Sequence, residues 1–527
     1  MQRDQMIDRL DGRSEPWDML VIGGGATGAG IAVDAASRGY AVLLVEQHDF
    51  GKGTSSRSTK LAHGGVRYLE QGNVSLVMEA LKERGLMRQN APHLVREVPF
   101  IVPNYVWWEA PFYGFGLKIY SMLAGKYGFG PCRRLSKSET LKRLPTIRTE
   151  GLRGGVVYYD GQFDDARMLI SLIATAAEQG ATVINYMKCA GLKRDDDGFI
   201  SGAVLHDQEA EREYEIRARV VINATGAYAD SVRKLAADQD EEIQSIIAPS
   251  QGIHLVFDRS FLPGDSAIMV PHTRDGRVMF AIPWHGHALV GTTDTALKET
   301  PLEPVPMEEE IEFILTTAGQ YLEKSPTEAD VLSMFAGIRP LVKSGDGNNT
   351  AALSRDHTIH IDHSGLITIA GGKWTTYRNM AQDCVDQAAT LGRLDEQECV
   401  TKRLNIHGFH SHASKFGPLE VYGSDAPEIL RMAKNDPALG ERLHADLPYI
   451  QAQVLWAVRE EMARSVEDVL SRRLRALPVN ARAAWAMAEP VAQCLAEELG
   501  RSPAWKEEQI AAFRKLCEAS LPCALIA

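Results

Sequence analysis

Residues 17–46 read WDMLVIGGGATGAGIAVDAASRGYAVLLVE, and this stretch decides the fold. The apolar run at 19–22 predicts a short buried strand, and the small residues of 29–38 predict a helix. A second apolar run at 40–45 predicts another buried strand. Because a tight glycine turn joins the first strand to the helix, we expect one βαβ unit with parallel strands.

The turn between the first strand and the helix matches the GxGxxG pattern of dinucleotide-binding proteins. Gly23 allows the tight turn, Gly25 lets backbone amides approach a diphosphate, and Gly28 allows close packing of the helix. Gly24 lies between them, and Glu46 ends the next strand, where it can accept hydrogen bonds from a ribose. The turn therefore predicts a dinucleotide cofactor, but the motif alone does not separate FAD from NAD.

Length and composition limit the classes of protein to consider. The chain has 527 residues, a formal net charge of −12 and a pI near 5.7. Its length predicts two or three structural units that share one cofactor site. Nucleic-acid binding is not expected, because the sequence has no run of clustered Lys and Arg. The seven cysteines are scattered and form no CxxC pair, so we expect neither disulfides nor a metal site.

The sequence shows no signal for secretion or for crossing a membrane. The first sixteen residues are polar and charged, and no stretch of about 18 apolar residues occurs. We therefore expect reduced thiols in a cytoplasmic setting. If the protein meets a membrane, we expect contact from one side only.

Further strands and a helical C-terminal region are predicted from the rest of the sequence. Strand signals occur at 155–159, 181–186, 218–222, 254–257, 278–282, 287–290 and 358–361. Helices are predicted at 449–461, 466–475, 481–499 and 503–519, with Ser465, Gly500 and Ser502 at capping positions. We expect a domain over residues 1–395, with interleaved cap segments at roughly 90–150 and 240–345, and a helical domain over residues 396–527.

Four further segments carry a resemblance to a known family. They are GTSSRSTK at 53–60 continuing through LAHGGVRYLE at 61–70, NATG at 223–226, GIRP at 337–340 and GGKWTTYR at 371–378. Over about residues 17–380 the chain resembles the FAD-dependent glycerol-3-phosphate dehydrogenase family, which also carries a helical C-terminal unit. The resemblance implies an α/β, glutathione-reductase-like FAD-binding fold with an interleaved antiparallel substrate-side sheet. It also implies FAD as the cofactor.

The residues expected to contact FAD lie in glycine- and hydroxyl-rich segments. Hydroxyl groups and bare backbone suit a diphosphate and the edge of an isoalloxazine ring, and a glycine turn that opens a helix suits the reduced ring. His63 is either a flavin contact or a structural residue of its loop. Beyond the residues of the first turn, the predicted contacts are Thr54, Ser55, Ser56, Lys60, His63, Gly64, Gly65, Thr225, Gly226, Gly372 and Thr375.

The substrate implied by the resemblance is sn-glycerol 3-phosphate, whose dianionic phosphate requires cations. Arg67, Arg339 and Lys373 are the candidates, because each follows or flanks a glycine-containing segment. Tyr68 is a further candidate for contact with the phosphate or a hydroxyl group. Thr293 belongs to a segment, Thr292–Asp294, that resembles another part of the family's site, although Asp294 could equally cap a turn.

Oxidation of a secondary alcohol also requires a group that takes the hydroxyl proton. His254 is the first candidate, because it begins a predicted strand and matches a substrate-site histidine of the family. Arg339 and Lys373 could instead stabilise the alkoxide, and the sequence does not rank these routes. The adjacent Asp164 and Asp165 do not predict a catalytic carboxylate pair, since an Asp before the helix expected at 166–177 is more simply its N-cap.

Residues 105–134 combine aromatic side chains with Lys118, Lys126, Arg133 and Arg134. This composition suits a bilayer interface, and an amphipathic helix around 112–123 is expected to lie in it. The alternative is an aromatic packing layer beneath a substrate cap. With the resemblance, we expect a peripheral protein on the inner face of the cell membrane that passes electrons to ubiquinone or menaquinone.

Three rival functions share some of these features. An oxidase of the same family would pass its electrons to oxygen and release peroxide. A flavin-bearing binding protein would lack turnover, and an amine or amino-acid oxidase would need a carboxylate clamp. The family is often dimeric, so a homodimer is an open expectation.

Overall fold

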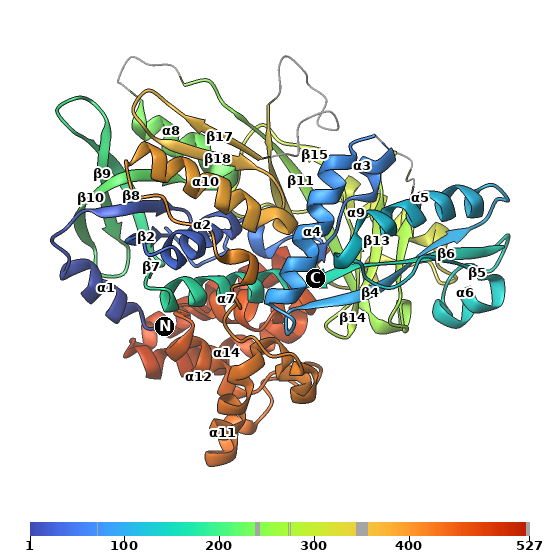
Figure 1. Cartoon of the computed structure of the whole chain (residues 1–527). Coiled ribbons are helices and arrows are strands. Elements are labelled where there is room, and N and C mark those ends of the chain that lie inside the picture. Colours follow the sequence, from blue (N-terminus) through green and yellow to red (C-terminus); the bar gives the residue numbers. More distant parts are fainter. Residues whose placement is uncertain (71, 238–242, 272, 274–275, 344–356, 523–527) are drawn as a thin grey trace.

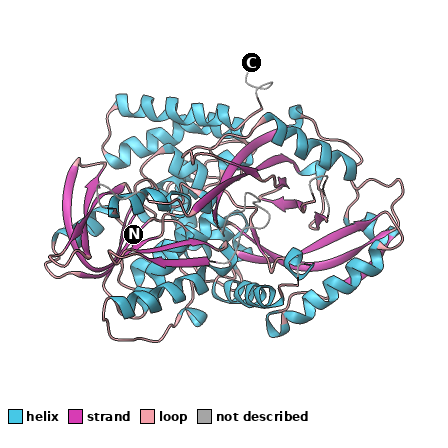
Figure 2. Cartoon of the chain, turned by 90° about the horizontal axis from the view of Figure 1, so that it is seen from above, coloured by secondary structure: helices cyan, strands magenta, loops and turns pink. Residues whose placement is uncertain are grey.

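The computed structural model describes all residues except 71, 238–242, 272, 274–275, 344–356 and 523–527, and the side chains of residues 67 and 70 are also not described. The described residues form two β-sheets, one of eight and one of ten strands. Figure 1 shows the first sheet at the left and the second at the right, with the C-terminal helices below them. The view from above in Figure 2 shows helices packed around both groups of strands.

The first sheet is built around the predicted βαβ unit. Its strands are β1 (Trp17–Ile22), β2 (Val42–Val45), β7 (Thr182–Ile184), β8 (Met187–Arg194), β9 (Ile200–Asp207), β10 (Arg212–Asn223), β17 (His357–Ile361) and β18 (Ile367–Gly371). The main order is β17-β18-β10-β1-β2-β7, in which β18, β10, β1, β2 and β7 are mutually parallel. β1 and β2 are buried along almost their whole length, as expected for parallel strands covered on both faces.

Two glycines explain how β1 turns sharply into helix α2 (Ala26–Ser37). Gly23 has φ +111°, and a Cβ atom there would lie 2.8 Å from the carbonyl oxygen of Ala224, directly after the neighbouring strand β10. A Cβ atom at Gly28 would overlap the carbonyl oxygen of Gly23. The helix therefore begins directly above the strand end, with its free amides directed at the space where β1, β2, β10 and β18 all end.

The second sheet is mainly antiparallel. Its strands are β3 (Leu61–Ala62), β4 (Val95–Asn104), β5 (Arg133–Ser136), β6 (Gly154–Phe163), β11 (Ile247–Asp258), β12 (Ala267–Val270), β13 (Met279–Trp284), β14 (His287–Gly291), β15 (Thr295–Ala296) and β16 (Val331–Val342). The main order is β15-β11-β14-β13-β12-β4-β6-β3, with β16 on β11 and a single parallel pair, β12 and β4, among the described strands. The seven further strands predicted from the sequence are all present, and the expected fold is confirmed.

Helices cover both sheets. Before residue 396 they are α1 (Arg3–Asp11), α2, α3 (Val66–Glu70), α4 (Val74–Asn90), α5 (Glu109–Leu123), α6 (Lys137–Arg143), α7 (Asp165–Glu178), α8 (Ala229–Ala236), α9 (Glu308–Tyr321) and α10 (Tyr377–Leu391). Among the described residues, the α-helices after it are α11 (Ala426–Asn435), α12 (Gln451–Glu460), α13 (Ala476–Val479), α14 (Ala481–Leu499) and α15 (Pro503–Ala519). The predicted helical C-terminal region is thus present, whereas its separation as a domain at residue 396 stays a prediction.

The C-terminal helices end where the sequence predicted. Gly500 is left-handed with φ +61° and ends α14, and Ser502 accepts a hydrogen bond from the amide of Trp505 at the start of α15. The segment 466–475 differs from the predicted α-helix, because residues 468–473 form a π-helical turn. In this turn, consecutive Arg472 and Arg473 both reach the buried carboxylate of Asp49 at 2.5–2.8 Å.

A histidine ties the segment after α10 to α7. His407 Nδ1 lies 2.6 Å from Oε1 of Glu178 and its Nε2 lies 2.7 Å from Oδ2 of Asp425. Burial disfavours the charged imidazole, but the two carboxylates outweigh burial and raise the pKa of His407 to about 10. His407 is therefore an imidazolium bridge at neutral pH.

We expect His407→Gln to lower the free energy of unfolding by about 2 kcal/mol at pH 6. Because the folded state raises the pKa above its unfolded value near 6.5, this stabilisation is complete below pH 6.5 and is lost as the pH rises through 10. Thermal melts of both proteins at pH 6 and pH 10 check this, with His412→Gln at an exposed position as the control. An equal difference at both pH values would contradict the bridge.

Candidate functional site

A cavity of about 650 Å³ lies where the two sheets meet. On one side it is lined by the carboxyl ends of β1, β2, β10 and β18, and on the other by β11 and β16. Ligands of open α/β sheets bind in this position, outside the carboxyl ends of the strands. The predicted site residues that line it are Gly23, Gly25, Glu46, Thr54, Ser55, His63, Tyr68, Thr225, Gly226, His254, Arg339, Gly372, Lys373 and Thr375.

One end of the cavity is formed by the glycine turn and the start of α2. The amides of Gly24 and His48 donate to the carboxylate of Glu46 at 2.8 and 2.9 Å. Burial raises the pKa of Glu46, and these two hydrogen bonds oppose the rise. Gly24 and Gly28 lie just behind the cavity wall, where they shape the turn and do not line the cavity.

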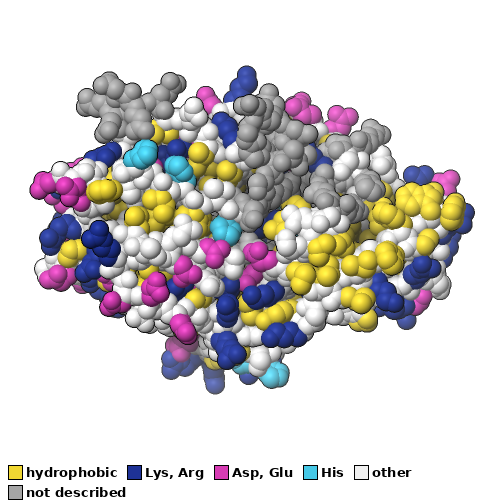
Figure 3. Space-filling view, turned by 45° about the horizontal axis from the view of Figure 1, so that its top comes forward, with side chains coloured by type: hydrophobic (Ala, Val, Ile, Leu, Met, Phe, Trp, Pro, Cys, Tyr) yellow, Lys and Arg dark blue, Asp and Glu magenta, His cyan; other side chains and the backbone are white. Residues whose placement is uncertain are grey.

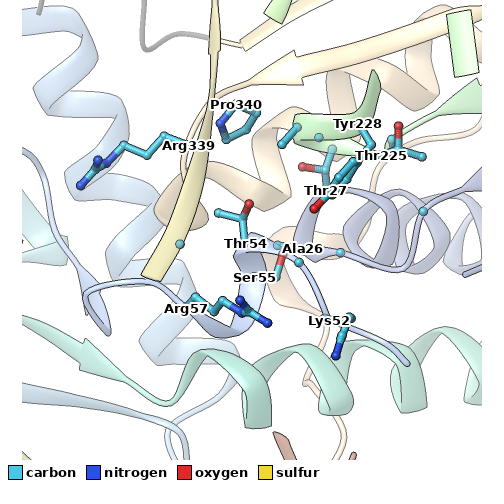
Figure 4. A pocket seen from close by; sticks show the side chains of 18 of the residues that line it. Ala26, Thr27, Lys52, Thr54, Ser55, Arg57, Thr225, Tyr228, Arg339 and Pro340 are labelled. Carbon is cyan, nitrogen blue, oxygen red and sulfur yellow. Dashed lines mark hydrogen bonds between the residues drawn. The ribbon is translucent and has the colours of Figure 1, made fainter. Parts of the chain in front are cut away.

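The residues at this end fit the diphosphate of a dinucleotide. The first turn of α2 contains no acidic residue, and its N-cap, Gly25, offers no side chain to compete for the free amides. Ser55 Oγ accepts a hydrogen bond of 2.9 Å from the amide of Ala26. Figure 4 shows Thr54 and Ser55 beside Ala26, with Arg57 and Lys52 on the neighbouring stretch of the same loop. Negative phosphate oxygens would meet backbone amides and hydroxyls here, whereas Lys52 and Arg57 are both ion-paired with Glu303.

Loop 53–60 is held against two other segments. Thr54 Oγ1 donates to the carbonyl of Ile338 at 2.6 Å, and the indole of Trp374 donates to the carbonyl of Ser55 at 2.9 Å. The amide of His63 donates to Thr375 Oγ1 at 3.2 Å. The three segments of the resemblance that begin at residues 53, 337 and 371 are therefore assembled around one cavity, as the sequence predicted.

Arg339 enters the cavity from β16. Its guanidinium donates to the carbonyl of Thr293 at 2.9 Å and to Thr292 Oγ1 at 3.2 Å, and it lies 3.3 Å from the carboxylate of Asp294. A side chain at Gly252 would clash with this guanidinium, so glycine gives it room. Figure 4 shows Arg339 directed away from the group formed by Thr225 and Tyr228. Arg339 therefore belongs to the opposite end of the cavity from the glycine turn.

Lys373 and Tyr68 form a second cationic element of the wall. Lys373 Nζ lies 3.8 Å from the centre of the Tyr68 ring, an arrangement in which the ring face attracts the ammonium. Lys373 comes from the turn after β18, and Tyr68 from α3. Arg67 belongs to α3 as well, but its side chain lies outside those that the structure describes. Its predicted contact with the substrate therefore stays a prediction.

His254 is a buried histidine on β11 that lines the same cavity. Its Nε2 lies 3.0 Å from Oγ1 of Thr59, and its ring stacks on Phe335 with centroids 5.0 Å apart. Gly291 opposite it leaves room for the ring. Burial lowers the pKa of His254 well below its usual range, and the charges of Lys60 and Arg339 lower it further. The imidazole is therefore neutral at neutral pH and able to accept a proton.

Five predicted residues lie elsewhere than expected. Lys60 and Ser56 are directed away from the cavity, because the ammonium of Lys60 is fully buried against Asp165 and the carbonyl of Ser56. Gly64 and Gly65 pack against Tyr120 and Tyr68 and do not line the cavity. The hydroxyl of Thr293 donates to Glu310 at 2.8 Å, so the contribution of Thr293 to the site is the carbonyl that holds Arg339.

Several residues in or beside the cavity were not predicted. Thr59 and Arg57 lie in the predicted loop, and their side chains could have been included on the same grounds as those of Thr54 and Ser55. The sequence did not decide whether Asp294 belongs to the site or caps a turn. In the structure its carboxylate lies 3.3 Å from the guanidinium of Arg339 and helps to hold it. Asp164 is the N-cap of α7, as predicted, and accepts from the amide of Arg167 at 3.1 Å. Within the described residues, no group of three or more His, Cys, Asp or Glu side chains could hold a metal ion.

Helix α5 and the two residues before it carry apolar side chains that point to solvent. Trp107, Trp108, Phe112, Phe115 and Met122 are between 45 and 75% exposed. Figure 3 shows hydrophobic side chains gathered at the right-hand end of the molecule, where Figure 1 places α5, with basic side chains beside them. The other face of α5 packs inward through Tyr113, Leu117 and Tyr120, whereas contact of the exposed face with a bilayer stays a prediction. None of the helices over the described residues is both long and apolar enough to span a bilayer.

The sequence and the fold match known proteins over nearly the whole chain. The family model of FAD-dependent oxidoreductases matches residues 18–378, and that of the C-terminal domain of alpha-glycerophosphate oxidase matches residues 366–509. A probable mitochondrial glycerol-3-phosphate dehydrogenase of Caenorhabditis elegans is 40% identical, over 94% of this chain and 73% of that protein.

Two solved structures extend the comparison. The glycerol-3-phosphate dehydrogenase of Bacillus halodurans, solved with FAD, is 30% identical with a TM-score of 0.80, over 99% of this chain and 98% of that one. The L-alpha-glycerophosphate oxidase of Mycoplasma pneumoniae is 18% identical with a TM-score of 0.56, over 74% of this chain and 98% of that one. The second likeness concerns the fold alone.

Proposed function

Because this chain belongs to the FAD-dependent oxidoreductases, within the glycerol-3-phosphate dehydrogenase family, we propose that it oxidises sn-glycerol 3-phosphate to dihydroxyacetone phosphate. Bound FAD supplies the acceptor for the hydride that leaves C2 of the substrate. The observation that carries the proposal is the convergence of two cationic side chains, Arg339 and Lys373, with the neutral His254 at one cavity.

The cationic groups suit the substrate's phosphate. A guanidinium can bind a phosphate through two hydrogen bonds, and an ammonium adds a point charge. Asp294 and the carbonyl of Thr293 fix the direction of Arg339 before any ligand binds. A substrate held at its phosphate is oriented at C2, which removes most of the entropic barrier to reaction.

His254 is proposed to take the hydroxyl proton. Thr59 Oγ1 lies in the cavity wall and approaches His254 Nε2 to 3.0 Å. In this route the substrate hydroxyl gives its proton to Thr59 Oγ1, which passes its own proton to Nε2 as the C2–H bond breaks. The ring proton of the neutral imidazole then resides on Nδ1. The positive charges of Arg339 and Lys373 stabilise the negative charge that develops on the oxygen.

The test is anaerobic mixing of the purified, FAD-loaded protein with sn-glycerol 3-phosphate while flavin absorbance is followed. Bleaching supports the proposed oxidation, and an unchanged spectrum would exclude this substrate. Adding a soluble quinone or oxygen to the reduced protein then separates the two acceptors. Fast recovery with quinone and slow recovery with oxygen supports the dehydrogenase, whereas fast recovery with oxygen would favour the oxidase.

We further propose that α5 binds a membrane surface, where a lipid-soluble quinone takes the electrons. The exposed aromatic and Met side chains would enter the headgroup boundary, and the exposed Lys118, Lys126, Arg133 and Arg134 would meet anionic lipid. Each buried aromatic side chain contributes about 1.5–3 kcal/mol.

The double variant Trp107→Ser, Phe115→Ser is expected to weaken binding to anionic lipid vesicles by at least about 100-fold. Vesicle co-sedimentation measures this, while flavin reduction by the substrate in solution should be unchanged. Phe199→Ser, at a large exposed side chain far from α5 in the sequence, is the control. Undiminished sedimentation of the double variant would remove α5 as the membrane-binding element.

A further inference from the structure

A buried cluster of charges lies behind loop 53–60, outside the cavity. Lys60 and Asp165 are fully buried and Arg475 is 2% exposed. Lys60 Nζ donates to Asp165 Oδ2 at 2.7 Å and to the carbonyl of Ser56 at 2.8 Å. Arg475 Nη2 donates to the carbonyl of Ser56 at 2.9 Å and to Asp165 Oδ1 at 3.0 Å. Two cations therefore hold the same carbonyl and the same carboxylate.

The cluster also fixes the backbone of the loop. Both the amide and the hydroxyl of Ser58 donate to Asp165 Oδ2, at 2.9 and 2.7 Å. The loop is thus attached at Ser56, Ser58 and Lys60, and Thr59 lies between the last two. Asp165 begins α7, and Arg475 precedes α13, so elements far apart in the sequence set the position of Thr59.

The cluster reaches His254 by two contacts. Thr59 Oγ1 lies 3.0 Å from Nε2 of His254. The Phe335 ring stacks on His254 and also lies 4.8 Å from Lys60 Nζ, so one aromatic side chain contacts both groups. Removing either cation would leave Asp165 without one of its partners in the interior, and such changes are costly.

The charges near His254 and Lys60 determine in which direction Lys60 changes the pKa of His254. The charged groups that face His254 are Lys60 and Arg339. Lys60 itself faces Asp165, Asp164 and Arg475, and burial, with the charge of Arg475, lowers the pKa of Lys60 to about 7. Lys60 is therefore an ammonium in the range below pH 6.5, in which an imidazole would gain its second proton. A cation near an imidazole disfavours that protonation.

We propose that Lys60 and Arg475, joined through Asp165, are positioning residues for the proton transfer, because they hold the loop that carries Thr59 against His254. This inference rests on the proposed function, in which His254 accepts the hydroxyl proton. It also gives the helical C-terminal region a part in the reaction, since Arg475 lies 419 residues from Ser56.

The test is the pH dependence of anaerobic flavin reduction by sn-glycerol 3-phosphate. The rate falls on the acid side as His254 becomes protonated. Lys60→Met removes the charge. We therefore expect the acid limb of the pH profile, where the rate falls as the pH is lowered, to move to higher pH by about one unit. At a pH on that limb the rate should be about tenfold lower than in the wild type. Lys60→Gln also removes the charge but keeps a donor for Ser56 and Asp165, and it should shift the limb in the same direction if the methionine variant fails to fold.

Two variants separate charge from structure. Arg475→Lys keeps the charge, and its acid limb should stay within about 0.3 unit of the wild-type limb, whereas Arg475→Met should shift it upward. Arg167→Met is the matched control, because Arg167 forms an equally buried pair with Glu461 between α7 and the C-terminal region without touching loop 53–60. Arg167→Met should lower the midpoint of thermal unfolding and leave the acid limb of the pH profile at its wild-type position.

The outcomes are distinguishable. The substrate phosphate has its own ionisation near pH 6, but it contributes equally to every variant. If the wild-type flavin is not bleached, the proposed function fails. If the wild-type flavin is bleached and the FAD-loaded Lys60 and Arg475→Met variants keep an unshifted acid limb, only this inference is overturned.

Discussion

Replacing Arg339 with alanine is expected to leave FAD bound and to slow flavin reduction by at least about 100-fold. Arg339 lies at the end of the cavity away from the glycine turn, so its loss should spare the contacts to the diphosphate. Its guanidinium is fixed by Asp294 and by the carbonyl of Thr293. The variant therefore lacks a guanidinium that is already oriented toward the substrate. Its removal should lower the rate of flavin reduction as well as the affinity for the substrate.

Stopped-flow absorbance under anaerobic conditions measures the reduction rate, and the ratio of flavin to protein absorbance measures bound FAD. Arg259→Ala is the control, since Arg259 is a half-buried arginine that does not line the cavity and pairs with Asp265 at 3.1 Å. Normal reduction kinetics in Arg339→Ala would remove Arg339 from the site. Loss of FAD from this variant would instead place Arg339 among the cofactor contacts.

The second large effect is expected for Gly28→Ala, which should yield protein with weakly held FAD. A Cβ atom at residue 28 would overlap the carbonyl oxygen of Gly23, which is backbone and cannot swing aside. Helix α2 would have to move away from the strand end, and its amides would no longer be directed at the diphosphate. Overpacking of this kind costs about 1–3 kcal/mol, and if this cost falls on the bound state it corresponds to about a 5- to 150-fold weaker affinity.

Titration of the apoprotein with FAD, followed by quenching of flavin fluorescence, measures this affinity. Gly191→Ala is the matched control, because a Cβ atom there meets nothing within 4 Å. It should bind FAD as the unaltered chain does. An unchanged affinity of Gly28→Ala would mean that the start of α2 is not a cofactor contact.

The sequence predicted the first sheet well because its signals are local. The turn at Gly23–Gly28 and the apolar runs on either side of it are adjacent in the chain, and each follows from backbone geometry and burial. Four strands of the second sheet, β6, β11, β13 and β14, were also recognisable one by one, whereas the others were not predicted. The order of the strands was not recognisable either, since the pairing of β11 with β16 and of β4 with β6 joins segments that no local signal relates.

For the same reason, the site was predicted in outline, while some of the predicted residues do not line the cavity. Lys60 looked like a cofactor contact because its neighbours are hydroxyl-bearing residues. Asp165, about a hundred residues away, draws its ammonium to the other side of the loop. Thr293 was named because its segment resembles part of the family's site; its hydroxyl donates to Glu310, and its carbonyl holds Arg339. Arg475 could not have been found, because an isolated arginine in a helical region is ordinarily a surface charge.

The arrangement of the first sheet also decides when the site can form during synthesis of the chain. β1 pairs with β10, and β10 pairs with β18, which ends at Gly371. At 5–20 residues per second, the ribosome needs on the order of 20–75 s to reach the turn that follows β18. Until then β10 has an unpaired edge, a surface prone to aggregation. Capture of the cofactor must therefore be a late event, and folding of this nascent chain should depend on protection of that edge by chaperones.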